Sequence, residues 1–343
     1  MQLFERDIAI DLGTVTTRIY VQGKGIRLHE ATVVAVDRRN GRAIRIGEDA
    51  KKMLGRTPAN IAAIHPIAAG VISDYDMTSR MLREFISRVT SFSFFKPRVL
   101  ILVPGSVTGV EERAIIDAVI EGGARKVYLL ESPVATAYGA GIDAKKANGN
   151  MIVDIGGGTT EIAVISLDGV AAGQSVKTAG TGFDEAIVKY IRKKHNLAIG
   201  MQTAEELKCR IGGVVEKPEV QYEEVRGRCL LTGLPKTVTV SSSELAEAME
   251  EPAALILEAI HGVLEQTPPE LVTDIAENGI VMAGGGSLLY GMDQLIAEKT
   301  GIDAVTVDDP LNCNVYGAGR ALRDLDEMSD GMINLARRKQ MKG

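Results

Sequence analysis

Asp11-Leu12-Gly13-Thr14 and Asp154-Ile155-Gly156-Gly157-Gly158-Thr159 are related stretches that lie 143 residues apart, counted from Asp11 to Asp154. Each follows a short apolar run, which predicts a buried strand. A glycine turn after a strand lets backbone N–H groups approach a phosphate closely, and an aspartate at the strand end can hold a hydrated divalent metal. The repetition therefore predicts two related lobes that grip one nucleoside triphosphate.

Length and composition limit the kind of protein. A chain of 343 residues is longer than one hydrophobic core usually serves, so two domains are expected. Hydrophobic residues make up 45% and charged residues 24%, as is ordinary for a globular protein. No apolar run has the length of a membrane span and no secretory signal is visible, so we expect a cytoplasmic location. The three dispersed cysteines predict reduced thiols, and the net charge of -6 argues against a nucleic-acid partner.

Strand and helix patterns alternate along the chain, which predicts an α/β fold with mixed sheets covered by helices. The pattern of the start, a strand, a glycine turn and two further strands, returns near residue 151, so we expect a duplication. Lobe I should comprise residues 1–146 and 315–343, with a small subdomain inserted at about 31–70. Lobe II should comprise residues 147–314, with a small subdomain at about 181–243.

A third glycine turn, Gly284-Gly285-Gly286-Ser287, also follows an apolar run. One glycine turn alone is more often a tight turn than a ligand site. Three such turns, two of them with aspartates at the strand ends, predict nucleotide binding. Thr14 and Thr16 can supply hydroxyl donors to phosphate oxygens, and Asp11 and Asp154 can bind Mg²⁺ through water. The alternative interpretation is that both aspartates only cap their turns.

These motifs resemble those of the actin-like ATPases, and within them the bacterial rod-shape proteins of the MreB and Mbl type. The resemblance runs from Asp7 to about Leu322. It rests on Asp11–Thr14, Val99–Pro104, Asp154–Val164, Gly180–Tyr190, Thr203–Lys208, the Gly284 turn and Asn314–Gly319. It implies the two-lobed actin fold, which is a duplicated ribonuclease H-like ATPase fold, with ATP or ADP and Mg²⁺ in the central cleft. It also implies polar double filaments on the inner membrane that guide cell-wall synthesis.

The nucleotide site that follows has two parts. Glycine turns and strand ends are expected to hold the phosphates, and the resemblance adds contacts to adenosine from a helix and from the third glycine turn. The phosphate group comprises Asp11, Gly13, Thr14, Val15, Thr16, Gly156, Gly157, Gly158 and Thr159. The adenosine group comprises Glu205, Glu206, Leu207, Lys208, Gly284, Gly285, Gly286 and Ser287.

Leu130-Glu131-Ser132-Pro133 departs from the family pattern. The family usually has two glutamates before this proline, and the second, which positions the attacking water, aligns with Ser132. A serine can hydrogen-bond a water but cannot act as a carboxylate base near neutral pH. We therefore expect slow hydrolysis, or positioning of the water by Glu131 or Asp154, while ATP binding survives. Thr16 is a milder departure, because the family commonly has asparagine there.

An aromatic stretch after a predicted helix suggests membrane contact. Phe92, Phe94 and Phe95 are three of the six phenylalanines in the chain. Aromatic side chains on a loop are suited to insertion at the headgroup boundary of a bilayer, and the resembling family inserts a hydrophobic loop at this place. We expect peripheral association with the inner face of the cell membrane. The alternative is that Phe92 and Phe95 cap the core beneath the loop.

Three functional hypotheses share this ATPase fold. The preferred one is a filament-forming cytoskeletal protein whose partners are copies of itself, the membrane surface and the cell-wall elongation machinery. A small-molecule kinase would need an acidic base, and Ser132 removes the obvious candidate. A chaperone-type ATPase would need a peptide-binding domain, for which the residues after Leu322 are expected to be too few.

Overall fold

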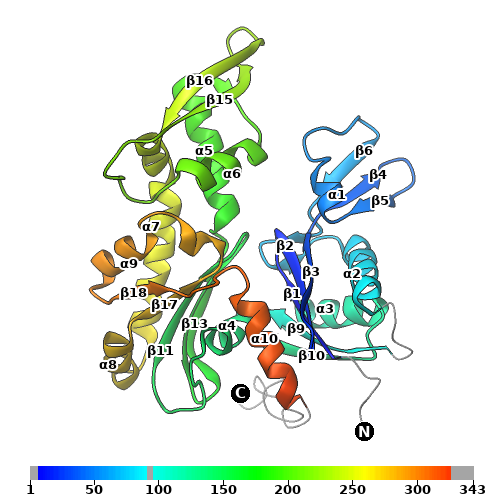
Figure 1. Ribbon diagram of the computed structural model, residues 1–343, viewed down its shortest axis with the longest axis vertical. Helices are drawn as coiled ribbons and strands as arrows, with labels where there is room; N and C mark the ends of the chain where they lie inside the picture. The colour runs from blue at the N-terminus through cyan, green and yellow to red at the C-terminus, as the bar shows by residue number, and fades with distance from the viewer. Residues whose placement is uncertain (1–6, 91–95, 326–343) are drawn as a thin grey trace. The chain divides into compact units, whose positions relative to one another are not determined.

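The computed structural model describes residues 7–90 and 96–325, and the chain divides into two compact units. Unit 1 consists of Met1–Lys146 and Asn312–Gly343, and unit 2 consists of Ala147–Leu311. Each unit contains a five-stranded sheet with helices, which confirms the predicted α/β class. Figure 1 shows the elements of both units.

The sheet of unit 1 has the strand order β10-β9-β1-β2-β3. Strands β1, β2 and β3 are antiparallel neighbours, whereas β9 runs parallel to both β1 and β10. The strands are β1 (Ile8–Leu12), β2 (Thr16–Val21), β3 (Gly25–Ala31), β9 (Arg98–Val103) and β10 (Lys126–Glu131). Because β1, β9 and β10 are parallel, their carboxyl ends lie at one edge of the sheet.

Helices α2 (Tyr75–Thr90) and α3 (Gly109–Glu121) contribute to the core of unit 1. The apolar stripe of α2 includes Met81, Leu82 and Phe85, all with 0% exposure, and it clusters with alternate residues of β1 and β2. This is the arrangement that helical periodicity predicts for a helix packed on a sheet. A capping box of Thr108 and Glu111 begins α3.

Helices α4 (Ser132–Ala140) and α10 (Cys313–Ala321) pack closely against each other. A Cβ atom at Gly317 would lie 1.7 Å from the carbonyl oxygen of Ala135, so only glycine permits this approach. The first turn of α10 is part of the contact, because a Cβ atom at Gly139 would lie 2.0 Å from the carbonyl oxygen of Cys313. Unit 1 accordingly resumes at Asn312, three residues before the start expected from the sequence.

A small sheet of unit 1 has the order β5-β4-β6. It is formed by β4 (Val34–Asp37), β5 (Arg42–Ile46) and β6 (Ile61–Ile64), with α1 (Glu48–Lys51) beside it. Its own cluster of buried small residues is Ala31, Val33, Ala35 and Ala50. A short two-stranded sheet of β7 (Ile67–Ala68) and β8 (Val71–Ile72) leads on to α2.

The sheet of unit 2 has the order β13-β12-β11-β17-β18 and repeats the topology of unit 1. Three antiparallel strands are followed by two parallel ones in both sheets. The strands are β11 (Asn150–Ile155), β12 (Thr160–Ser166), β13 (Gly169–Val176), β17 (Ile280–Ala283) and β18 (Ala304–Thr306). The shared topology confirms the predicted duplication.

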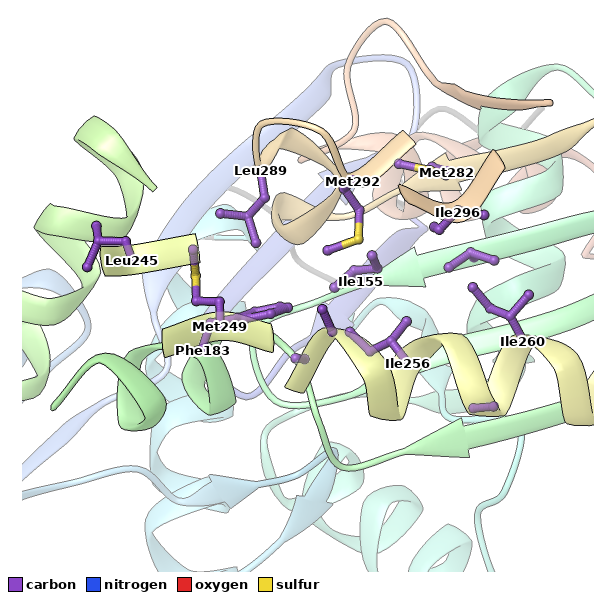
Figure 2. Close-up of a cluster of buried hydrophobic side chains, with 14 of the residues drawn as sticks. Ile155, Phe183, Leu245, Met249, Ile256, Ile260, Met282, Leu289, Met292 and Ile296 are labelled. Atoms are coloured by element: carbon purple, nitrogen blue, oxygen red, sulfur yellow. The ribbon is translucent and has the colours of Figure 1, made fainter. Parts of the chain in front are cut away.

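The core of unit 2 centres on the long helix α7 (Ser242–Gln266). Figure 2 shows Met249, Ile256 and Ile260 of α7 in one cluster with residues of the sheet and of α9 (Met292–Thr300). A capping box of Ser241 and Glu244 begins α7, and the helix continues through Pro252.

The remaining part of unit 2 carries a small sheet with the order β14-β15-β16. Its elements are α5 (Gly180–His195), β14 (Leu197–Ala198), α6 (Met201–Ile211), β15 (Tyr222–Cys229) and β16 (Pro235–Ser241). Helix α8 (Pro269–Asn278) and the 3₁₀ turn η1 (Gly285–Leu288) flank β17. Across residues 7–90 and 96–325, no helix combines the length and apolarity needed to cross a membrane.

Candidate functional site

The glycine turns after β1 and β11 are closed by the same hydrogen bond. The N–H of Gly13 donates to the carbonyl oxygen of Thr16 at 3.1 Å, and the N–H of Gly156 donates to that of Thr159 at 2.9 Å. A Cβ atom at Gly13 would lie 2.7 Å from the Thr16 oxygen, and one at Gly156 would lie 3.0 Å from the Thr159 oxygen. The turn at Gly13 therefore has no room for a side chain, and the turn at Gly156 is tight.

The turn of unit 1 is fixed by Thr32 and Gly70. The Oγ1 of Thr32 donates to the carbonyl oxygen of Gly13 at 2.8 Å. The backbone N–H of Thr32 donates to the carbonyl oxygen of Val15 at 2.9 Å. The N–H of Gly70 donates to Oγ1 of Thr14 at 3.0 Å. An accepted hydrogen bond still leaves a hydroxyl proton to donate, so Thr14 can supply the donor that the sequence analysis assigned to it.

Asp11 lies opposite Arg18 across the β1–β2 hairpin. Nη1 of Arg18 is 3.7 Å from Oδ2 of Asp11, and the two side chains are only 10% and 17% exposed. Arg18 is not among the site residues predicted from the sequence. The sequence did contain a signal for this pair. Asp11 and Arg18 are equally far from the centre of the turn, and residues at equal distances from the turn lie opposite each other in a hairpin.

The corresponding pair in unit 2 has a different charge. Asp154 lies opposite Glu161 across the β11–β12 hairpin, and the two residues are 5% and 4% exposed. Ser175 donates a hydrogen bond from Oγ to Oε1 of Glu161 at 2.6 Å. Two carboxylates in one buried place concentrate negative charge, which favours either a proton or a cation beside them.

The turn of unit 2 packs against the start of α5. The N–H of Gly180 donates to the carbonyl oxygen of Gly156 at 3.0 Å. Thr181 donates twice to the carbonyl oxygen of Gly157, from its N–H at 2.8 Å and from Oγ1 at 2.9 Å. These hydrogen bonds hold the glycine turn at the N-terminus of a helix, a favourable place for an anion.

The third glycine turn lies beside the second, because β17 pairs with β11 and places Ala283 next to Asp154. Gly284 has a φ of +78°, and a Cβ atom there would lie 2.4 Å from Oδ1 of Asp154 and 2.3 Å from the carbonyl oxygen of Ile155. The Oγ of Ser287, which is 5% exposed, donates to the carbonyl oxygen of Gly284 at 2.8 Å. Unit 2 thus gathers two of the three predicted glycine turns around one buried aspartate.

Lys208 of α6 joins the start of α5. Its Nζ lies 2.8 Å from Oδ1 of Asp184 and donates to the carbonyl oxygen of Gly180 at 2.8 Å. Burial raises the pKa of Asp184, and the Lys208 ammonium opposes that effect. Leu207 is 3% exposed and packs in the core, so of the α6 candidates it has the least side chain available to a ligand. Glu205 is half-buried and Glu206 is exposed.

Glu131 and Ser132 lie where β10 ends and α4 begins. Glu131 is level with Val103 of β9, so it shares a sheet edge with Asp11 at the end of β1. The Oγ of Ser132 donates to the carbonyl oxygen of Val103 at 3.1 Å. Ser132 therefore ties the end of β9 to the start of α4, a structural role that the sequence alone did not suggest.

The donors around Asp154 suit a magnesium ion that is shared with a phosphate. Within the described residues, no group of three or more histidine, cysteine, aspartate or glutamate side chains is arranged to hold a metal. Mg²⁺ is commonly bound by one or two carboxylates, with phosphates and water completing its shell. The Asp154 and Glu161 pair meets that requirement. Phe92, Phe94 and Phe95, the expected membrane contacts, lie outside the described residues.

Comparison with known proteins decides the family. The family model of the MreB/Mbl proteins matches residues 5–330. The chain belongs to the MreB/Mbl family. It is 46% identical over 327 residues to the cell shape-determining protein Mbl of Bacillus cereus, with 95% of this chain and 98% of the relative covered. It is 49% identical over 332 residues to the cell shape-determining protein MreB of Escherichia coli K12, with 94% and 95% covered.

Solved structures place this MreB/Mbl chain in the actin-like fold. MreB5 of Spiroplasma citri bound to ADP is 34% identical, with a TM-score of 0.91 over 95% of this chain and 99% of that one. The same protein bound to AMPPNP has a TM-score of 0.90, with 94% of this chain and 97% of that chain covered. The MamK double helical filament, 23% identical with a TM-score of 0.79 over 93% and 99%, shares the fold. The resemblance predicted from the motifs is confirmed, and family membership does not favour the kinase or chaperone alternatives.

Proposed function

We propose that this chain is an ATP-binding actin-like cytoskeletal protein that forms membrane-associated filaments, organising cell-wall synthesis and cell shape. The observation that carries the proposal is the repeated aspartate and glycine turn, present once in each of two units of equal topology. Support comes from relatives that are named cell shape-determining proteins and from the Spiroplasma citri structures bound to ADP and AMPPNP.

Residues of both units are proposed to bind one nucleotide. The turns at Gly13 and at Gly156–Gly158 would approach the phosphates through backbone N–H groups. Glu205, Glu206 and Lys208 of α6 and the Gly284–Ser287 turn would contact adenosine. Asp11 and Asp154 would hold Mg²⁺ through water, and the bound ion would offset the charge of the phosphates. These roles stay predictions of the sequence analysis, and the buried carboxylates and close-packed glycines of unit 2 agree with them.

Slow hydrolysis is the second part of the proposal. The hydroxyl proton of Ser132 is directed to the carbonyl oxygen of Val103, so this side chain supplies neither a carboxylate nor a free donor to a water. Glu131, one residue earlier, or Asp154 in unit 2 would have to position the water. A filament subunit that hydrolyses ATP slowly retains the nucleotide state in which it assembled.

Filament formation follows from self-association. Contacts between unlike surfaces of identical subunits give open polymers when the rotation does not close into a ring. Bound nucleotide can select the conformation that adds to the polymer end. Repeated weak contacts of Phe92, Phe94 and Phe95 with lipid would then sum to firm attachment of the polymer to the membrane.

Sedimentation of the purified chain tests the proposal. Ordered polymer should pellet in Mg-ATP and should co-pellet with anionic vesicles, and electron microscopy of the pellet should show filaments. A monomer that stays in the supernatant and releases ADP only when a sugar is added would favour the kinase instead. Calorimetry that detects no uptake of ATP or ADP in the presence of Mg²⁺ would overturn the proposal altogether.

A further inference from the structure

Arg18 is a buried cation beside the phosphate turn of unit 1. The residue is 9% exposed, and β2 places it two positions after Thr16, which closes the turn. Directly opposed residues of an antiparallel pair project to the same side of the sheet. Arg18 and Asp11 therefore extend from the same face of the hairpin, the face on which the strand-end aspartate is expected to meet the nucleotide.

The guanidinium of Arg18 has an unused donor, its Nε–H. Its separation from Asp11, 3.7 Å between Nη1 and Oδ2, is an ion-pair distance longer than a hydrogen bond. Its Nε is buried and has no hydrogen-bond acceptor among residues 7–90 and 96–325. An arginine side chain carries five N–H donors in a fixed fork, and a buried donor without an acceptor is costly. Asp11 therefore does not satisfy all the N–H donors of the Arg18 guanidinium.

The duplication gives an internal comparison for this position. Arg18 corresponds to Glu161, because each is paired with the strand-end aspartate of its own hairpin. Unit 1 places an anion opposite a cation there, whereas unit 2 places two buried carboxylates together. Two carboxylates favour a metal ion, whereas a guanidinium favours a phosphate oxygen, since its planar fork matches the geometry of phosphate.

The charge of Arg18 also influences its other cross-strand neighbour. His29 of β3 lies opposite Arg18, and its pKa is lowered, first by burial and then by the positive charge of Arg18. The positive charge of Arg18 therefore acts on both neighbouring strands, on β1 through the ion pair with Asp11 and on β3 through His29.

We propose that Arg18 is a phosphate-binding residue, whose guanidinium donates hydrogen bonds to a nucleotide phosphate while its charge offsets that of Asp11. The inference rests on the proposed nucleotide binding and adds a division of labour to it. The hairpin of unit 1 binds phosphate through a side-chain cation as well as through its glycine turn. The hairpin of unit 2 carries no such cation and contributes carboxylates, which would hold the metal together with Asp11.

Nucleotide affinity of two variants tests the assignment. Arg18→Met removes the charge and keeps much of the apolar stem, and Arg18→Lys keeps the charge without the fork. Isothermal calorimetry with ADP, ATP and adenosine, in Mg²⁺, measures the phosphate contribution directly. We expect Arg18→Met to weaken ADP and ATP binding by about 10- to 100-fold, the effect of a lost charged hydrogen bond. Adenosine affinity should stay within about 3-fold, and Arg18→Lys should fall between wild type and Arg18→Met.

Two results would overturn the assignment. Equal weakening of ADP and adenosine would mean that Arg18 only supports the fold, and unchanged ADP affinity in Arg18→Met would mean that Arg18 does not contact the phosphates. Failure of the wild-type chain to bind any of the three ligands would instead overturn the proposed function, because Arg18 is intact there.

A measurement on the wild-type chain covers the case in which Arg18→Met does not fold. The Nε–H resonance of Arg18, identified by its loss in the ¹⁵N spectrum of Arg18→Lys, should shift when ADP is added and should not shift with adenosine. A resonance that responds equally to both ligands, or to neither, would contradict phosphate binding by Arg18.

Discussion

Asp154 and Glu161 face each other across the β11–β12 hairpin, and both side chains are almost completely buried. Like charges held close together disfavour the ionisation of both groups unless a cation or hydrogen-bond donors compensate. Ser175 supplies one donor to Glu161. A magnesium ion carried by a nucleotide would add positive charge beside this pair, so the pair should couple metal binding to nucleotide binding.

Asp154→Asn should reduce the dependence of nucleotide binding on magnesium. The substitution keeps the shape of the side chain but removes the charge that would attract the hydrated ion. We expect the ratio of ATP affinity in Mg²⁺ to ATP affinity in EDTA to fall by about 10-fold, which corresponds to about 1.4 kcal/mol. Asp293→Asn, at an exposed position in the first turn of α9, makes the same change in net charge and should leave the ratio unaltered. Equal ratios for Asp154→Asn and wild type would remove Asp154 from the metal site.

Gly284→Ala should destabilise unit 2 through lack of space as well as through backbone strain. Gly284 and Gly301 both have positive φ, of +78° and +73°, but only Gly284 has neighbours within reach of a new Cβ atom. Gly301→Ala, at the end of α9, should cost about 1 kcal/mol for the left-handed conformation. Gly284→Ala should cost about 1 to 3 kcal/mol more, because the Cβ atom overlaps Ile155 and Asp154. Urea denaturation measures both, and equal losses would show that the turn can relax.

Ser132→Glu should raise the rate of phosphate release from ATP, because it restores a carboxylate where the family usually has one. The variant also loses the hydrogen bond to Val103, so it should be less stable by about 1 kcal/mol. Ser132→Ala loses the same hydrogen bond without gaining a carboxylate, and its rate should match that of wild type. A phosphate assay and thermal unfolding of the three proteins separate the two effects. An unchanged rate in Ser132→Glu would mean that another residue already positions the water.

Glu244 should make the stability of α7 depend on pH. Burial alone would raise the pKa of Glu244, but hydrogen bonds from the Ser241 backbone, His195 and the Ser241 hydroxyl lower it below its ordinary value of 4.5. A lowered folded-state pKa means that the unfolded chain takes up the proton first as pH falls. The contribution of Glu244 is therefore present above pH 4.5 and is lost as pH drops further.

Glu244→Gln measures that contribution. At pH 7 the variant should be less stable than wild type by about 0.5 to 2 kcal/mol, the usual value of a helix cap, and the difference should shrink below pH 4.5. Glu250→Gln, at an exposed position further along α7, is the matched control and should show no such trend. Urea denaturation at pH 7 and at pH 4 provides the comparison. A difference that grows on acidification would contradict the sign of the shift.

Replacement of Phe94 and Phe95 by serine should abolish co-sedimentation with vesicles while nucleotide affinity stays within about 3-fold of wild type. The reason is the loss of the aromatic groups that would enter the headgroup region. Leu231 lies in the loop between β15 and β16 and is 79% exposed. Leu231→Ser therefore removes another exposed apolar side chain and should leave vesicle binding intact. Loss of vesicle binding and of nucleotide binding together would indicate that the phenylalanines support the fold instead.

Much of the architecture could be predicted because strands, helices and tight turns depend on the pattern of neighbouring residues. The apolar runs before Gly13 and Gly156 predicted β1 and β11, and their repetition predicted two sheets of one design. Met81, Leu82 and Phe85 have the spacing of one helix face, and this face of α2 is buried. The start of α10 was not predicted from the sequence. Its first residues are assigned to unit 1 by close packing on Gly139, a contact with a residue far away in the chain.

The sequence by itself determined that two strand-end aspartates each precede a glycine turn, because strands and tight turns depend on neighbouring residues. Only the tertiary structure decided which side chains face those aspartates. Hairpin register sets Arg18 against Asp11 and Glu161 against Asp154, and parallel pairing of β17 with β11 brings Gly284 onto Asp154 from more than a hundred residues away. The electrostatic environment of each aspartate is set by all the charged groups that pack around it. Packing between distant segments is fixed only when the whole unit folds.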